Sequence, residues 1–103
     1  PRSTPLYSSA ASDVYKRQGW TRPALDQRDR RMLMVGAIAA LGEGMTFGIQ
    51  AKAALKNGEL SPEQLREVLI HLTQYVGYPR VAPLLAVVEQ KIAEVAAEKE
   101  ASD

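Results

Sequence analysis

Residues 61–80 hold a strong helix start, a clear helix stop and the only histidine, and they constrain the fold of this chain most. Ser61 is placed to cap a helix, Pro62 suits its first position, and Gln64 completes a capping box with Ser61. Apolar residues then recur three and four positions apart, namely Leu65, Val68, Leu69, Leu72 and Val76. Because Gly77 ends this pattern, the sequence predicts an amphipathic helix with one buried face.

Three other segments have helical periodicity, at about 27–41, 45–56 and 80–99. The stretches 42–44 and 57–58 are rich in glycine and separate them. Four helices joined by short loops predict an all-α fold of antiparallel helical hairpins. We expect other subunits to cover apolar area left on the first and last helices, and therefore expect a homo-oligomer.

Composition excludes several classes of protein. The chain has no cysteine, so it forms no disulfide and carries no thiol redox chemistry. Its apolar stretches are shorter than the roughly 18 residues of a membrane helix, and one isolated histidine does not predict a metal site. The net charge is +1, but residues 1–18 hold three basic residues and one acidic residue, so the remainder is slightly acidic. We therefore expect no nucleic-acid partner.

Residues 1–18 are rich in small polar residues and lack a helical or strand period. They resemble one reading frame of a transposase-type sequencing-library adapter. A native disordered tail is the alternative. We interpret residues 1–18 as a non-native leader and residues 19–103 as the domain, and we expect the native protein to be truncated before Gly19.

Glu67, His71 and Tyr75 are four residues apart and share one edge of the expected helix. A carboxylate one turn from an imidazole can orient it, and a tyrosine can donate a hydrogen bond. These three side chains are candidates for catalysis. The alternative is a boundary histidine with a structural role only.

The other polar candidates lie on the first two helices and before them. Gln50 is an amide amid apolar residues, and its alternative role is an exposed or interface amide. Arg28, Arg30 and Arg31 open the first helix, and Arg22 precedes it. The three arginines of the helix form either a solvated or salt-bridged face or a cluster that binds substrate carboxylates, and Arg22 is a further single candidate.

Two segments resemble the carboxymuconolactone decarboxylase family of the alkylhydroperoxidase D-like superfamily. Residues 20–30, WTRPALDQRDR, are similar to the family pattern W-x-R-P-G-L-D-x-R-x-R. Residues 53–79 are similar to the family patterns A-L-x-N-G, E-x-x-E-V-L and Y-x-G-x-P.

The resemblance implies an all-helical fold that assembles into homotrimers or homohexamers, with active sites near subunit contacts. It implies decarboxylation of 4-carboxymuconolactone, without a cofactor or metal, in cytoplasmic breakdown of aromatic compounds. Within this frame His71 is the candidate general acid and base, and Glu67 orients it. The remaining roles are hydrogen-bond donation by Gln50 and Tyr75 and substrate binding by Arg28, Arg30 and Arg22.

The chain also departs from the family patterns. The peroxidase branch has a Cys-x-x-Cys pair and a histidine where this chain has Glu43, Thr46 and Gln50, so we expect no thiol peroxidase activity. The decarboxylases typically have histidine at the position of Gln50 and glutamine at that of His71. The two side chains look exchanged. This leaves a second hypothesis, a non-catalytic oligomeric or ligand-binding member of the fold.

Overall fold

The computed structural model describes residues 20–102, and the fold it shows is all-α. The helices that lie wholly within this range are α3 (Gln27–Leu41), α4 (Gly44–Lys56), α5 (Pro62–Val76) and α6 (Tyr78–Ser102). No strand occurs in that part of the chain. The predicted leader, residues 1–18, lies outside the described residues.

Three of the predicted helices have nearly the predicted bounds. Helix α3 matches the prediction, with Asp26 as its cap and Gly42 in a left-handed conformation at its end. Helix α4 begins at Gly44, because the Glu43 side chain accepts a hydrogen bond from the Thr46 backbone N–H at 2.6 Å. This hydrogen bond also lowers the pKa of Glu43.

Helix α5 begins with the predicted capping box. The Gln64 backbone N–H donates to the Ser61 hydroxyl oxygen at 3.1 Å, and the Ser61 backbone N–H donates to the Gln64 side-chain oxygen at 2.9 Å. The helix ends at Gly77, whose φ of 95° strongly disfavours any residue with a β-carbon. The helix that carries the histidine is therefore fixed at both ends by local sequence.

Helix α6 is longer than the predicted 80–99. It begins at Tyr78, since Pro79 then falls in the first turn, where its missing N–H costs no helical hydrogen bond. It continues to Ser102, beyond the predicted end. Lys52 and Lys56 of α4 both pair with Glu98, which secures this last part of the helix.

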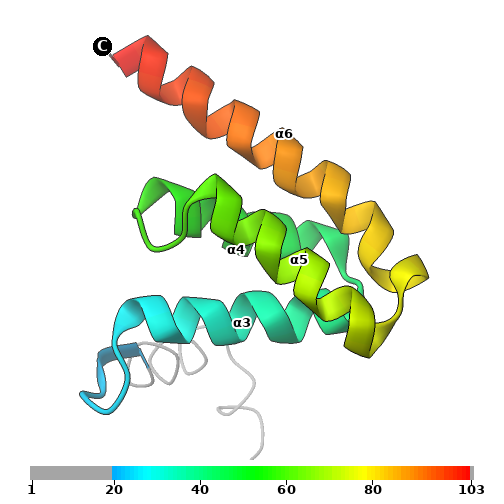
Figure 1. Cartoon of the computed structure of the whole chain (residues 1–103). Helices are drawn as coiled ribbons and strands as arrows, with labels where there is room; N and C mark the ends of the chain where they lie inside the picture. The colour runs from blue at the N-terminus through cyan, green and yellow to red at the C-terminus, as the bar shows by residue number, and fades with distance from the viewer. Residues whose placement is uncertain (1–19, 103) are drawn as a thin grey trace, which may run out of the picture.

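Helices α4 and α5 lie between α3 and α6 (Figure 1). The core draws on all four helices and the α4–α5 loop, and its members are Val35, Ile38, Ala39, Phe47, Ala51, Ala54, Leu60, Leu65, Leu69, Val81, Leu84 and Val88. The small residues Ala51 and Ala54 are fully buried, which lets α4 approach its neighbours closely. Burial of this apolar surface supplies most of the folding free energy.

Ion pairs fasten α6 to the two middle helices. Lys52 contacts Glu94 at 3.2 Å and Glu98 at 2.6 Å, and Arg66 of α5 grips Glu89 with two hydrogen bonds of 2.7 and 2.9 Å. Hydrogen bonds from Lys52 lower the pKa of Glu94 and of Glu98. Hydrogen bonds to Glu98 and Glu94 raise the pKa of Lys52 in turn.

Several large apolar side chains on α3 and α4 are exposed in the single chain, namely Leu33, Leu41, Met45 and Ile49. Helix α3 is thus buried on one side only, along Val35, Ile38 and Ala39. Within residues 20–102, the helices are all too short or too polar to cross a membrane.

A pair of neighbouring substitutions on α5 tests the core. Leu69 is fully buried and Ile70 is 57% exposed. We expect Leu69→Ala to lower the free energy of unfolding by about 2–4 kcal/mol, because it removes buried methyl groups and leaves a cavity. Ile70→Ala is the matched control and should cost about 0.5 kcal/mol or less in the monomer. Urea denaturation followed by circular dichroism measures both, and equal losses would contradict the assigned register of α5.

The α4–α6 ion pairs predict a pH dependence of stability. Because folding lowers the pKa of Glu94 and Glu98 from 4.5, their contribution is complete above that pH and is lost as the pH falls through the lower folded-state value. In Lys52→Gln the main cause of both shifts is gone, so we expect a shallower loss of stability on acidification. Lys99→Gln removes an α6 lysine that has no ion pair among residues 20–102, and it should keep the wild-type slope. Urea titrations at a series of pH values compare the three proteins.

Candidate functional site

A shallow hollow of about 250 Å³ lies between α3 and α5 and contains the only histidine. Met32 of α3 and Gln64, Glu67, Val68 and His71 of α5 line it, and we call it the α3–α5 hollow. The helical register predicted from the sequence thus places Glu67 and His71 on one shared surface. The exposed lining of the hollow is apolar, so Glu67 and His71 border it with their carbon atoms.

His71 is exposed and faces this hollow beside Tyr75. The two rings are 5.2 Å apart between centroids and are inclined at 50°. Tyr75 does not line the hollow, and most of its side chain is exposed. Among residues 20–102, no hydrogen bond joins the Glu67 carboxylate to the His71 imidazole, so the two groups are neighbours without a fixed mutual orientation.

Gln50 lies in a different environment, on α4 against α3. Its side-chain oxygen accepts a hydrogen bond of 2.5 Å from Nη1 of Arg31. It does not line the α3–α5 hollow. In the single chain, Gln50 and His71 therefore lie in different surroundings.

Arg31 is the most buried cation in the described part of the chain, and Glu59 is its partner. Their side chains meet at 2.6 Å between Nε and Oε1, and the residues are only 9% and 8% exposed. The Trp20 ring covers the Arg31 guanidinium at 4.6 Å from the ring centroid, and the Asn57 amide donates to Glu59 at 3.4 Å. We call Arg31, Glu59, Gln50, Asn57 and Trp20 the buried polar cluster.

Within the buried polar cluster, the positive charge of Arg31 is balanced by the negative charge of Glu59. A guanidinium that already donates to a carboxylate and an amide has less electrostatic attraction left for a substrate. Its contacts instead join the start of α3 to α4 and to the α4–α5 loop. The cluster therefore positions Gln50 and the loop that precedes α5.

The three arginines predicted to bind substrate have different surroundings. Arg30 donates to the backbone oxygens of Leu25 at 3.2 Å and Arg22 at 2.6 Å, which secures the segment before α3. Arg22 is exposed and provides only its carbonyl oxygen to this contact. Arg28 is exposed, has no hydrogen bond or ion pair to another residue in 20–102, and is therefore the arginine best placed for an external anion.

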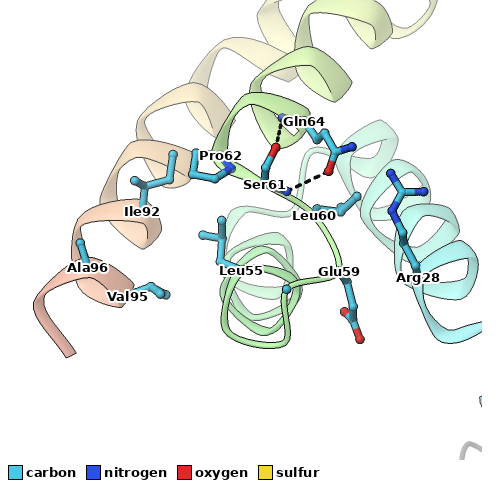
Figure 2. A pocket seen from close by; sticks show the side chains of 11 residues that line it. Arg28, Leu55, Glu59, Leu60, Ser61, Pro62, Gln64, Ile92, Val95 and Ala96 are labelled. Atoms are coloured by element: carbon cyan, nitrogen blue, oxygen red, sulfur yellow. Dashed lines mark hydrogen bonds between the residues drawn. The ribbon is translucent and has the colours of Figure 1, made fainter. Parts of the chain in front are cut away.

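A larger open cavity of about 430 Å³ adjoins the hollow at the start of α5 (Figure 2). Arg28 and Gln64 line it, and Gln64 also lines the α3–α5 hollow. The other side of this cavity is apolar and comes from α4 and α6. We call it the apolar cavity.

The chemistry available here is acid–base chemistry and anion binding. His71 carries an imidazole, a group that can transfer protons, and Arg28 can hold a carboxylate. Within residues 20–102, no group of three or more histidine, aspartate or glutamate side chains is arranged to hold a metal ion.

Sequence reasoning missed the importance of Arg31 and Glu59. Arg31 falls on the buried stripe of α3, four residues before Val35 and seven before Ile38, and a charge at that position predicts a buried partner. No local spacing identifies that partner, because Glu59 lies 28 residues further along the chain.

Removal of one partner tests the buried ion pair. We expect Arg31→Met to lower the free energy of unfolding by about 3–5 kcal/mol, because Glu59 is then left buried without a cation. The double variant Arg31→Met/Glu59→Leu should recover much of that loss. Arg30→Met is the matched control, a half-buried arginine that binds backbone oxygens and has no carboxylate partner among residues 20–102, and its loss should cost about 1–2 kcal/mol. Urea denaturation measures all three, and equal effects of the two single substitutions would contradict a special role for Arg31.

Comparison with known proteins places these features in context. A model of the carboxymuconolactone decarboxylase family matches residues 5–98. The match begins within residues 1–18, and the assignment of that segment as a non-native leader stays a prediction. No solved structure matches the chain significantly.

Two curated relatives are named as decarboxylases. The chain is 29% identical over 73 residues to a nitrosuccinic acid decarboxylase of Metarhizium robertsii, an alignment that covers 71% of this chain and 50% of that protein. It is 28% identical over 60 residues to a 4-carboxymuconolactone decarboxylase of Acinetobacter baylyi, with coverage of 58% and 44%. The chain thus spans about half the length of the curated relatives it matches.

The family match covers most of the chain, and it agrees with both the all-helical fold and the motifs at residues 20–30 and 53–79. This chain belongs to the carboxymuconolactone decarboxylase family.

Proposed function

We propose that this protein catalyses the decarboxylation of a small carboxylated acid without a cofactor, as part of the breakdown of aromatic compounds. The observation that carries the proposal is the α3–α5 hollow, which holds His71 and Glu67 in a chain whose two curated relatives are named as decarboxylases. A lactone acid or a related dicarboxylic acid is the proposed substrate class.

The substrates in the relatives' names share a chemical logic. Nitrosuccinic acid and 4-carboxymuconolactone each contain two carboxyl groups and one electron-accepting group, a nitro group or a lactone carbonyl. When the C–CO₂⁻ bond breaks, its electron pair moves into that accepting group and forms an oxyanion. The intermediate is then protonated on carbon. An enzyme for this reaction needs a cation for the retained carboxylate, a donor near the oxyanion and an acid for the carbon.

The proposed roles follow from where the side chains lie. His71 is the proposed proton donor, and Glu67 borders the same hollow. Arg28, next along the surface through Gln64, binds the retained carboxylate. Tyr75 beside the His71 ring is the proposed oxyanion donor. In the single chain Gln50 is engaged by Arg31, so its predicted catalytic role requires a rearrangement or a second subunit.

We further propose that copies of this chain associate as a homotrimer or homohexamer. The exposed apolar side chains Leu33, Leu41, Met45 and Ile49 on α3 and α4 support this proposal, because such groups gain free energy when another surface covers them. Association would add walls to the shallow α3–α5 hollow. The cytoplasmic location predicted from the sequence is part of the same proposal.

The second candidate function is binding of a small carboxylate without turnover. The separation of Gln50 from His71 favours it, since the hollow then has one catalytic group and little enclosure. Carbon dioxide release distinguishes the two candidate functions. A binding protein binds the acid in a calorimetric titration but releases no carbon dioxide, whereas the enzyme releases it.

Carbon dioxide release tests the catalytic proposal. Purified protein is incubated with 4-carboxymuconolactone and, separately, with nitrosuccinic acid. We expect turnover of at least one acid, and a fall in kcat of about 10²–10⁴-fold in His71→Ala, because the general acid is lost. Arg28→Gln should act mainly on KM, since it removes a contact to a group that does not react.

Gln74→Ala is the matched control, an exposed residue of α5 that does not line the hollow, and it should keep the wild-type rate. Equal rates in wild type and His71→Ala would remove His71 from the mechanism. Absence of turnover with both acids would exclude the two substrates and leave the binding function.

A further inference from the structure

The apolar cavity differs in character from the α3–α5 hollow. Its volume of about 430 Å³ lies in the range of small-molecule sites. Side chains from α4, the start of α5 and the C-terminal half of α6 form its apolar walls, namely Leu55, Leu60, Pro62, Ile92, Val95 and Ala96 (Figure 2). These walls match an apolar body rather than a second polar group.

The polar groups around this cavity are almost all engaged by other protein groups. Ser61 and Gln64 bind each other in the capping box, as the dashed lines in Figure 2 show. Glu59 is bound by Arg31 and Asn57, and its carboxylate points away from the apolar wall. These groups therefore do not need hydrogen bonds from a ligand.

Arg28 is the exception. It extends from α3 at the end of the cavity opposite α6 (Figure 2), and it has no ion pair or hydrogen bond to another residue in 20–102. The cavity thus combines apolar walls at one end with a single available cation at the other.

From this arrangement we infer that the apolar cavity binds an elongated monocarboxylate. Its carboxylate pairs with Arg28, and its aromatic or aliphatic body lies against Leu55, Ile92 and Val95. A compact dicarboxylate does not match the site, because its second charge would lie against apolar walls. The inference concerns binding alone and does not depend on decarboxylation.

An aromatic acid with a saturated side chain is a suitable probe. We choose 3-phenylpropionate, which has no group that can accept the electron pair released by decarboxylation and is therefore not a substrate for the proposed reaction. Titration into methyl-labelled protein should shift the NMR signals of Leu55, Leu60, Ile92 and Val95. The uncharged 3-phenylpropan-1-ol should bind about tenfold more weakly or worse, because it cannot form the charged pair with Arg28. Succinate should leave these methyl signals unchanged.

Two alanines of α6 provide a matched pair of variants. Both are exposed, but Ala96 lines the cavity and Ala93 does not. We expect Ala96→Trp to fill the cavity and abolish binding of the probe, and Ala93→Trp to keep wild-type affinity. Arg28→Gln should reduce the affinity for 3-phenylpropionate to that for the alcohol. Circular dichroism confirms that each variant is folded.

Several results would overturn the inference. One is unchanged binding in Ala96→Trp, and another is a response confined to Met32 and His71 in the α3–α5 hollow. In a third, the methyl signals of the cavity shift with protein concentration but not on addition of the probe. The occupant of the cavity would then be a second copy of the chain. Because no turnover is measured, failure here is separate from failure of the proposed decarboxylation.

Discussion

The ion pair between Arg31 and Glu59 is the interaction on which the arrangement of the surfaces depends. It joins α3 to the loop before α5 across 28 residues, and the side chains are almost completely buried. Two charges removed from water are tolerated only when each finds good partners. Here Gln50, Asn57 and Trp20 supply the remaining contacts. The pair holds the α4–α5 loop against α3 and so helps to position α5, which carries every residue of the α3–α5 hollow except Met32.

Because of this ion pair, the two sides of α3 differ in whether their charged groups are free to bind a ligand. Arg31 faces α4, and its guanidinium is already bound by Glu59 and Gln50. Arg28 and Met32 instead border the surfaces shared with α5. Two arginines three residues apart thus differ in what they can bind. Charge on a helix is available to a ligand only where the fold has left it without a partner, so a count of basic residues does not measure the capacity to bind anions.

The sequence was sufficient for most of the fold and for part of the site. Capping residues and glycines act locally, so Asp26, Ser61 and Gly77 predicted helix ends that the structure confirms. The edge of α5 was also predictable, because i and i+4 residues share a face whatever the helix packs against. Glu67 and His71 accordingly line one hollow.

What the sequence could not supply was the pairing of distant groups. The sequence marked Gln50 as a candidate polar donor, but no pattern in it predicted the hydrogen bond that Gln50 accepts from Arg31. The ion pairs of Glu98 with Lys52 and Lys56 were likewise unpredicted, since those lysines are more than 40 residues away in the chain. Such contacts depend on which helix faces which, and helical periodicity alone does not determine that.

The two surfaces also differ in what supports them. Leu65 and Leu69 are fully buried directly beneath the α5 residues of the hollow, so burial of apolar area holds that surface in place. The α6 wall of the apolar cavity, Ile92 to Ala96, is attached partly by ion pairs of Lys52 in α4 with Glu94 and Glu98. Partly exposed ion pairs of this kind are individually weak and are screened by salt. The position of His71 should therefore be insensitive to solution conditions that loosen the C-terminal half of α6, and the apolar cavity should change shape before the hollow does.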